Sequence, residues 1–444
     1  MQVEGDSMRK KILLAVFVLF MLASPVFFRL LGDNYSLPGR EVYSFLLHKS
    51  AWGIPFAGNI ISNVPLFILL FLPLVVVLFS FLLLNLILNE LGMKHDFRVV
   101  FLVVLSLSPL AQSLAFFAGV NMIVFPVFLL GFLFLLKKRV VLGSALLVFA
   151  SFLSPAQALV SVLVVFVVKK YWFDDRRLNF VAGLIGGIFL VFHSGFLFSL
   201  PDVFANIDFS DFFSEFGSFF GFGIFEIFLA GFGFFSLLRF RKDYSLVIYL
   251  FSGILILSFF IVGLRIYSLL IISFLNALII CEIFKRKWHV AVLKNLVLLT
   301  IFCGLLFASM SHAITLSKAE PSSKFVQGLT VLSDKKPGVV LTLQEYGDFV
   351  EFYSGKLPVV RGESVSSGLF SDYLNMFYSS DFSETLKLMK KYGVRYVIIT
   401  PEMKNGKVWK KDGEGLVFLV EYDKHFKKLI ENEGVAVWEV QYEE

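Results

Sequence analysis

A few charged and polar side chains lie beside or inside long apolar segments of this 444-residue chain. Asp33 and Glu41 follow the first apolar segment, His193 and Glu226 lie near the ends of two later ones, and Arg265 opens another. Because a charge at membrane depth costs several kcal/mol, each of them is a candidate for function. The loop charges predict that all five face the outside of a membrane, where no nucleotide is normally available. An enzyme acting there would use a substrate carried by a lipid.

An acidic segment follows His193 on the same predicted side. Its acidic residues alternate with Phe in the run FANIDFSDFFSEFGSFF, and they are Asp202, Asp208, Asp211 and Glu215. This alternation is typical of an amphipathic segment at the membrane interface. A divalent-ion site formed by these carboxylates is the alternative interpretation.

The composition indicates which class of protein must position these side chains. The chain is 57% hydrophobic and only 17% charged, and it contains 56 Phe residues. A soluble domain is about 45–50% apolar and about 25% charged. The two cysteines, Cys281 and Cys303, both lie in apolar segments and cannot form a disulfide framework. A soluble enzyme and a secreted disulfide scaffold are therefore excluded, and a polytopic membrane protein remains.

Eleven apolar segments are predicted to be membrane-spanning helices, since about 20 apolar residues cross the hydrocarbon core and helices satisfy their own backbone groups. The predicted spans are residues 12–29, 64–88, 99–117, 120–136, 140–152, 155–168, 178–200, 221–238, 246–262, 265–284 and 292–311. The fifth and sixth meet at Ser154-Pro155, so they are either one kinked helix or two separate ones.

The basic residues predict the orientation of these spans. Eighteen Lys and Arg residues occur in the N-terminus and in alternate loops, whereas the opposite loops carry four, Arg29, Arg40, Lys49 and Arg265. The positive-inside rule places the first set in the cytoplasm, so the C-terminal part is predicted to lie outside the plasma membrane. The net charge of +6 divides into +8 for residues 1–312 and −2 for residues 313–444. The basic excess thus reflects topology and not a nucleic-acid partner.

Residues 313–444 are predicted to form a small α/β domain beyond the membrane domain of residues 1–312. β-Branched runs indicate strands at 338–343, 356–360, 394–400 and 435–440. Helices are predicted at 345–354, 382–392 and 423–432, the second with its N-cap at Ser383-Glu384 and its end at Gly393. Alternating strands and helices favour a mostly parallel sheet. The Ser-rich stretch 362–380 is predicted to be a long loop.

Several runs resemble known membrane glycosyltransferases. The run GDNYSLPGREVYSFLLHKSAWGIP is similar to the opening outer loop of the GT-C superfamily, in which an acidic residue sits on a short helix at the membrane surface. The runs LTLQEYGDFVEFYSGKLPVVRG, ETLKLMKKYGVRYVIITPEM and GLRIY resemble the catalytic subunit of archaeal oligosaccharyltransferases. The first of them corresponds to that family's W-W-D-Y-G region, where identity is confined to Tyr346-Gly347.

The chain departs from that family at several motif positions. Leu343, Gln344 and Glu345 stand where the family has two Trp and an Asp, so specificity for an Asn-X-Ser/Thr acceptor is not implied. The family's second acidic pair would fall near Asn121, in the run AGVNMIV. The metal requirement therefore stays open, with a divalent cation as one alternative.

The resemblance implies transfer of a sugar from a polyprenyl-phosphate donor to a protein, lipid or glycan acceptor, with inversion. In such a reaction a carboxylate removes the acceptor proton, a role open to Glu41 or Asp33. A cation must neutralise the leaving phosphate, and Arg265 matches its oxygens bidentately. His193 and Glu226 are candidates for supporting roles.

The resemblance also implies an acceptor-side motif, formed by Glu345, Tyr346 and Gly347.

Structural interpretations stand beside these roles. Asp33 can be a turn residue, Glu41 a water-facing residue, Arg265 a snorkelling side chain, His193 a helix–helix hydrogen-bond partner, and Glu226 the partner of a neighbouring polar group. Two other functions stay open for the whole chain, a catalytically inactive GT-C-like protein and a transporter or lipid flippase. Only the break at Ser154-Pro155 favours the transporter class.

Overall fold

A computed structural model describes residues 2–40, 43, 47, 66–119, 121–172, 175–194, 209–239, 241–361, 367–379, 381–409 and 414–442. The chain divides into two compact units. The membrane unit comprises Met1–Arg29 and Ile68–Lys318, and the second unit, which we call the outer unit after its predicted location, comprises Leu30–Phe67 and Ala319–Glu444. The first loop after helix α1 (Gln2–Leu31) thus groups with the C-terminal part of the chain.

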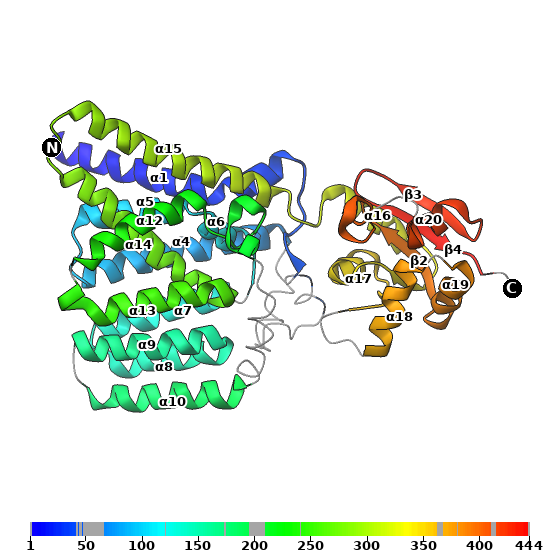
Figure 1. Ribbon diagram of the computed structural model, residues 1–444, viewed down its shortest axis with the longest axis horizontal. Coiled ribbons are helices and arrows are strands. Elements are labelled where there is room, and N and C mark those ends of the chain that lie inside the picture. The colour runs from blue at the N-terminus through cyan, green and yellow to red at the C-terminus, as the bar shows by residue number, and fades with distance from the viewer. Residues whose placement is uncertain are drawn as a thin grey trace. The chain divides into compact units, whose positions relative to one another are not determined.

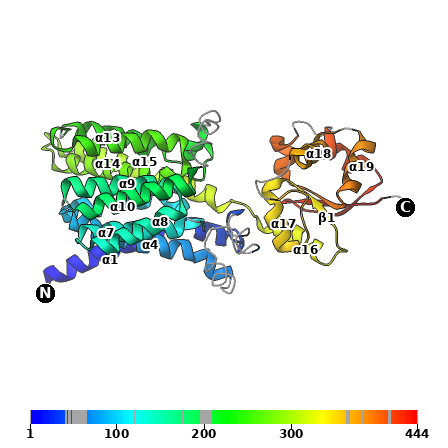
Figure 2. The same cartoon turned by 90° about the horizontal axis from the view of Figure 1, so that it is seen from below.

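The membrane unit consists of roughly parallel apolar helices, whose axes run across the view in Figures 1 and 2. After α1, its described helices are α4 (Leu66–Glu90), α5 (His95–Leu107), α6 (Pro109–Phe116), α7 (Asn121–Leu136), α8 (Val140–Leu153), α9 (Pro155–Tyr171), α10 (Arg176–Phe192), α12 (Ile224–Leu238), α13 (Arg241–Phe260), α14 (Arg265–Lys285) and α15 (Ala291–Ser317). Short 3₁₀ turns η1 (Phe209–Phe212), η2 (Ser214–Phe216) and η3 (Val262–Leu264) precede α12 and α14. Each predicted span overlaps a helix of this unit.

Helix length separates these helices into two groups. Among the described residues, four helices are long and apolar enough to cross a membrane, Ile12–Leu31, Ile68–Glu90, Val262–Lys285 and Ala291–Ser317. The bent pair α5 and α6 would make a fifth. Others are shorter: the 14 residues of α8 extend about 21 Å, less than the hydrocarbon core of about 30 Å. Helix length alone therefore does not confirm eleven spans.

Two breaks interrupt the helices at Ser-Pro pairs. Ser108 lies between α5 and α6, which bend by 68°. Ser154 is extended between α8 and α9, and these two helices pack against each other (Figure 1). Each Pro begins the next helix, where its missing N–H leaves no hydrogen bond unmade. The segments 140–152 and 155–168 are therefore two helices and not one kinked helix.

A close backbone approach joins α12 to α14. A Cβ at Gly233 of α12 would collide with the backbone carbonyl of Leu275 in α14. Small residues let membrane helices approach each other closely. This contact sets the spacing of the two helices that carry Glu226 and Arg265.

The outer unit is built on a four-stranded sheet in the order β1-β2-β4-β3. Its strands are β1 (Val339–Leu341), β2 (Val394–Ile399), β3 (Phe426–Glu431) and β4 (Ala436–Val440). Its helices are α16 (Ser323–Ser333), α17 (Gly347–Ser354), α18 (Ser367–Tyr378), α19 (Phe382–Lys391) and α20 (Gly415–Tyr422), with the 3₁₀ turn η4 (Gln344–Tyr346) and a π-helical turn at Met403–Lys407. Helices α16 and α17 lie on one side of the sheet and α18 and α19 on the other (Figure 2).

The sheet is mixed and not mostly parallel, because one predicted helix is a strand. Only β1 and β2 pair in parallel, whereas β4 is antiparallel to both of its neighbours. The segment 423–432 was expected to be helical, but it contains β3. The Oδ1 of Asn432 accepts hydrogen bonds from the backbone N–H groups of Gly434 and Val435, and this tight turn folds β3 back onto β4.

Three smaller expectations for this unit were also wrong. Residues 356–360 form only an isolated bridge between Pro358 and Val340. The stretch 362–380 contains α18 and is not a long loop. The N-cap of α19 is Asp381, whose carboxylate accepts hydrogen bonds from the backbone N–H groups of Ser383 and Glu384.

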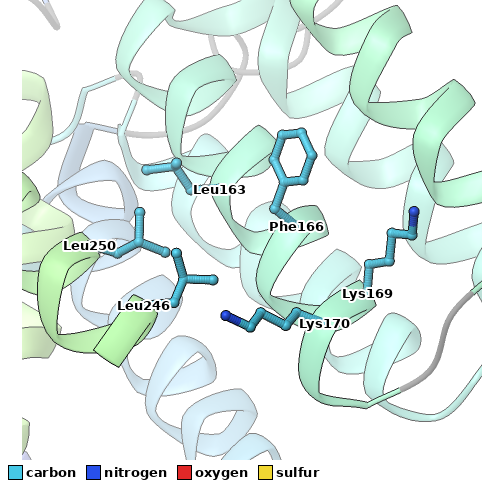
Figure 3. Close-up of a pocket in the computed structure, with 6 residues that line it drawn as sticks. All are labelled: Leu163, Phe166, Lys169, Lys170, Leu246 and Leu250. Atoms are coloured by element: carbon cyan, nitrogen blue, oxygen red, sulfur yellow. The ribbon is translucent and has the colours of Figure 1, made fainter. Parts of the chain in front are cut away.

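A cavity of about 550 Å³ lies in the membrane unit between α9 and α13 (Figure 3). Leucine and phenylalanine side chains form its wall, and two lysines near the end of α9 complete its lining.

Candidate functional site

Arg265 begins α14, as the sequence predicted, and its guanidinium is buried. Nη1 donates hydrogen bonds to the backbone carbonyls of Asp211 (2.6 Å) and Phe220 (3.2 Å), and Nε donates to that of Ser258 (3.4 Å). The guanidinium carbon also lies 5.6 Å from the centre of the Phe212 ring. Within the described residues its hydrogen bonds use Nε and Nη1 and go to uncharged acceptors. The side chain thus holds the loop before α12 while it keeps its positive charge.

Glu226 lies in the first turn of α12 and is fully buried. Its Oε2 accepts a hydrogen bond of 2.9 Å from the hydroxyl of Ser108, at the bend between α5 and α6. Its Oε1 has no hydrogen-bond partner in the described part of the chain. Glu215 accepts hydrogen bonds from the backbone N–H of Ile224, at the start of the same helix. Carboxylates at a helix N-terminus are favoured by its positive end.

A row of buried polar side chains continues along α6, and the sequence did not predict it. The amide of Gln112 donates to the hydroxyl of Ser309 (2.7 Å) and to the carbonyl of Met21 (3.0 Å). The hydroxyl of Ser113 lies 2.9 Å from Nε2 of His312. Helices α1, α6 and α15 are therefore joined by polar contacts, and the only sequence signal was polar residues within apolar runs.

His193 caps the end of α10, and its Nε2 lies 2.9 Å from the carbonyl oxygen of Ser151 in α8. None of its described contacts reaches Arg265 or Glu226. The structure therefore gives His193 the geometry of a link between two helices.

Asp33 is an exposed residue in the turn after α1. Its backbone lies in the left-handed region at φ 54°, and its N–H donates to the carbonyl of Leu30. Asp tolerates this conformation better than most residues, so the turn interpretation agrees with the geometry. Glu41, Asp202 and Asp208 lie outside the described residues.

Residues on both sides of Glu41 are anchored to α17. Nε of Arg40 lies 2.6 Å from Oδ2 of Asp348, whose side chain is 2% exposed. The hydroxyl of Tyr43 lies 2.7 Å from that of Tyr353, and its ring makes an edge contact with Phe349 at 5.0 Å. The sequence could not predict these contacts, since Arg40 and Asp348 are 308 positions apart.

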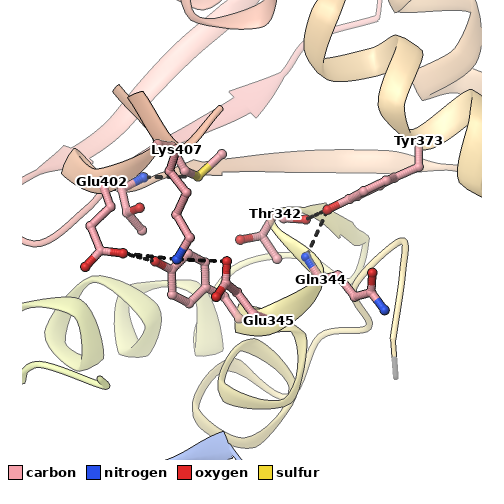
Figure 4. A network of polar contacts seen from close by, with 9 residues as sticks. Thr342, Gln344, Glu345, Tyr373, Glu402 and Lys407 are labelled. Atoms are coloured by element: carbon pink, nitrogen blue, oxygen red, sulfur yellow. Dashed lines mark hydrogen bonds and ion pairs between the residues drawn. The ribbon is translucent and has the colours of Figure 1, made fainter. Parts of the chain in front are cut away.

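The predicted acceptor-side motif forms η4 and the start of α17 (Figure 4). Nζ of Lys407 lies 2.9 Å from Oε1 of Glu345 and 3.2 Å from Oε2 of Glu402. The buried hydroxyl of Tyr346 donates to the same Oε2 at 2.9 Å. The side chains of Glu345 and Lys407 are 48% and 38% exposed. One ammonium group thus holds two carboxylates at a surface that a ligand can reach.

A tyrosine from α18 fixes the chain just before this motif. The hydroxyl of Tyr373 accepts a hydrogen bond from the backbone N–H of Gln344 (2.9 Å) and donates to the carbonyl of Thr342 (3.1 Å). Burial raises the pKa of Tyr373 to about 12. Burial alone would lower the pKa of Lys407, but hydrogen bonds to Glu345 and Glu402 and the charges around it raise the pKa above its ordinary value. Both groups therefore stay protonated at neutral pH.

Comparison with solved structures identifies the fold. An archaeal oligosaccharyltransferase, AglB from Archaeoglobus fulgidus in complex with an inhibitory peptide and a dolichol-phosphate, is 14% identical, with a TM-score of 0.55 over 94% of this chain and 73% of its own. The enzyme from the same organism tethered to an acceptor peptide with an NVT sequon is 14% identical, with a TM-score of 0.57 over 98% and 75%. A complex with Zn and sulfate is 12% identical, with a TM-score of 0.58 over 96% and 73%. This chain has the fold of archaeal oligosaccharyltransferase.

The resemblance predicted from the sequence is thus confirmed at the level of the fold. No protein-family model and no curated protein sequence matches the chain. At 12–14% identity the comparison supports a polytopic helical membrane protein with a small C-terminal sheet domain. It does not assign roles to individual residues.

The described residues contain no group of three or more His, Cys, Asp or Glu side chains that could hold a metal ion. Of the four carboxylates that the sequence offered for a divalent cation, Asp202 and Asp208 lie outside this part of the chain.

Proposed function

We propose that this chain is a membrane glycosyltransferase of the GT-C type. It would transfer a sugar or glycan from a polyprenyl-phosphate-linked donor to an acceptor on the extracytoplasmic face. The observation that carries the proposal is the fold shared with archaeal oligosaccharyltransferase over 94–98% of this chain. Structures of that enzyme contain a dolichol-phosphate or an acceptor peptide. Because one fold can host several functions, the roles depend on individual residues.

The proposed topology has eleven passes, a cytoplasmic N-terminus and an extracytoplasmic domain of residues 313–444 in the plasma membrane. Its support is the eighteen Lys and Arg residues in alternate loops. Shorter helices such as α8 are compatible with this count if the bilayer thins around them. Protease treatment of intact cells should remove the C-terminal domain, whereas a protected domain would contradict the orientation.

Arg265 is the proposed phosphate-binding residue. All its hydrogen bonds within the described residues go to uncharged carbonyls, and it forms no close ion pair among those residues. Negative charge grows on the phosphate as it leaves, and a fixed cation stabilises that charge more in the transition state than in the ground state. His193 and Glu226 would support the site indirectly, by joining α10 to α8 and α12 to the bend of α5 and α6.

Glu41 is the proposed general base, with Asp33 as the alternative. The carboxylate would take the proton of the acceptor hydroxyl as its oxygen attacks the anomeric carbon. The bond from that carbon to the phosphate oxygen breaks in the same step, and the electron pair leaves with the phosphate. Arg40 and Tyr43 support this role, since their contacts with α17 restrain the chain on both sides of Glu41.

Glu345, Tyr346 and Gly347 form the proposed acceptor-side surface. Glu345 is half exposed, pairs with Lys407 and can accept a hydrogen bond from an acceptor. Tyr346 is buried and fixes the surface through Glu402. A cation and two carboxylates favour a polar acceptor, and they do not distinguish a protein from a glycan.

The test is transfer of labelled sugar from a polyprenyl-phosphate donor by the purified full-length protein. We expect transfer by the wild type, and a loss of about 100-fold or more in Glu41→Gln or Asp33→Asn, whichever is the base. The exposed carboxylate Glu433 lies in the β3–β4 turn, so Glu433→Gln is a matched control that should keep full activity. Failure of every donor, or full activity in both variants, would overturn the proposal.

A further inference from the structure

Helix α20 of the outer unit (Figure 1) exposes two neighbouring aromatic rings. Its aliphatic residues are buried, namely Leu416, Val417, Leu419 and Val420. Phe418 and Tyr422, by contrast, are 42% and 75% exposed, and their ring centres are 4.8 Å apart. Side chains four positions apart share one face of a helix. An aromatic pair that is open to solvent is typical of a binding surface and not of a core.

The same face of α20 carries two carboxylates. Glu414 lies four residues before Phe418 and Glu421 lies three residues after it, and both are exposed. Glu414 is the N-cap residue, but its side chain forms no capping hydrogen bond with the helix. Nζ of Lys404 lies 2.9 Å from Oε1 of Glu421. We call Glu414, Phe418, Glu421 and Tyr422, together with Lys404, the α20 surface.

The α20 surface adjoins the predicted acceptor-side motif. Lys404 and Lys407 belong to the same π-helical turn. Lys404 pairs with Glu421 of α20, whereas Lys407 pairs with Glu345 of the motif (Figure 4). Two ion pairs from one short turn therefore connect the aromatic pair to the motif within the outer unit.

The groups on the α20 surface match an uncharged carbohydrate. The face of an aromatic ring carries negative charge, so the C–H groups on one side of a sugar ring lie favourably against it. The hydroxyl groups at the edge of the sugar can then donate to carboxylates and accept from an ammonium group. Hydrogen bonds to charged groups are stronger than those between neutral groups.

Other partners fit the α20 surface less well. A membrane with anionic lipids attracts clusters of basic residues, whereas this surface has two carboxylates and one ammonium group. In a two-fold contact, a second copy of the chain would present the same face, which would bring the carboxylates of both copies together. An apolar peptide would bury these carboxylates without new partners, which is costly.

We infer that the α20 surface binds a neutral oligosaccharide and that the acceptor of the reaction is therefore a glycan. The sugar rings lie on Phe418 and Tyr422, and their hydroxyl groups bond to Glu421 and Lys404. The assignment to the acceptor rests on the proposed function, whereas the binding of a saccharide does not require it.

The test is saturation-transfer difference NMR of the purified full-length protein in phosphatidylcholine nanodiscs, which contain no sugar head groups. The probes are the neutral hexasaccharides of glucose, mannose and N-acetylglucosamine. We expect at least one of them to bind, and Tyr422→Ala should weaken its affinity roughly tenfold, because the more exposed ring is lost. Tyr422→Trp should keep the affinity. The matched control is Tyr35→Ala, which removes another exposed tyrosine of the outer unit and should change the affinity less than twofold.

Two results would overturn the inference that a saccharide binds here. They are the absence of binding of all three hexasaccharides, and equal affinities of Tyr422→Ala and Tyr35→Ala. In the transfer assay, Tyr422→Ala should raise the KM for a glycan acceptor and leave the KM for the donor unchanged. A rise confined to the donor would overturn the assignment to the acceptor. Hexasaccharide binding by a protein that transfers no sugar would support the α20 surface and contradict the proposed function instead.

Discussion

The two units of this molecule hold their candidate cations in opposite ways. In the membrane unit, Arg265 is bound by backbone carbonyls and forms no ion pair with a described residue. In the outer unit, Lys407 is bound by the carboxylates of Glu345 and Glu402, and Arg40 by that of Asp348. Carbonyl dipoles hold a cation without cancelling its charge, whereas carboxylates cancel it. In the proposed roles, the guanidinium of Arg265 meets the phosphate, and the second arrangement offers carboxylate oxygens to an acceptor.

The largest effect is expected from removal of the buried cation of the membrane unit, Arg265. Arg265→Ala should lower the rate of transfer by about 100-fold or more, as loss of a preorganised charge does at other active sites. It also leaves buried carbonyls without donors, which costs about 1–3 kcal/mol for each unsatisfied group. Arg265→Lys should recover part of the rate. The control variant is Arg239→Ala, which changes an exposed arginine after α12. Equal transfer rates for Arg265→Ala and Arg239→Ala would show that Arg265 has no role in the reaction.

The contact between α12 and α14 offers a test of the scaffold around this cation. Gly233→Ala places a methyl group against the carbonyl of Leu275 and should destabilise the membrane unit by about 1–3 kcal/mol. Gly231→Ala is a matched control in the same helix, because a Cβ there meets nothing within 4 Å. Thermal unfolding in detergent should separate the two variants. Identical melting temperatures would show that the close approach is not needed.

The ion pair between Arg40 and Asp348 tests how the carboxylates of the outer unit hold a cation. Arg40→Ala leaves the buried Asp348 without its partner and should lower the free energy of unfolding of the outer unit by about 1–3 kcal/mol. The double variant Arg40→Ala/Asp348→Ala should be less destabilised than the two single losses added together. Denaturation followed by fluorescence of the buried Trp409 and Trp438 measures the free energy of unfolding of the single and double variants. Additive losses would mean that the two residues do not interact.

The smallest effect on stability is expected from a change at the exposed carboxylate of Glu345. Glu345→Gln should change the free energy of unfolding by less than about 1 kcal/mol, because the pair with Lys407 is open to solvent. It should raise the KM for the acceptor while it leaves donor binding unchanged. Measured KM values for both substrates decide the point, and a change confined to the donor would contradict the assignment of Glu345 to the acceptor side.

Local sequence patterns predicted the structural features that depend on residues close together in the chain. The apolar runs predicted the helices of the membrane unit, and Arg265 begins α14 as expected. The break at Ser154-Pro155 proved to be a turn between two packed helices, since a Pro can begin a helix as readily as kink one. Strand β3 was mistaken for a helix because its apolar residues, Phe426 and Ile430, also fit a helical spacing.

Long-range contacts could not be predicted in this way. The pairs of Arg40 with Asp348 and of Tyr43 with Tyr353 join residues about 310 positions apart. Glu226 was singled out for its charge, but its partner Ser108 lies 118 positions away at a helix break. Such pairs depend on which helices become neighbours, and a single sequence contains no periodic signal for that.

The central claim is a displacement at the anomeric carbon, so the configuration of the product tests it most directly. Purified protein would be given a polyprenyl-phosphate sugar labelled at the anomeric carbon, and the product would be read by NMR. The account predicts a single product of inverted configuration, formed at least about 100-fold more slowly by Arg265→Ala. A product of retained configuration, or no product with any polyprenyl-phosphate donor, would contradict it.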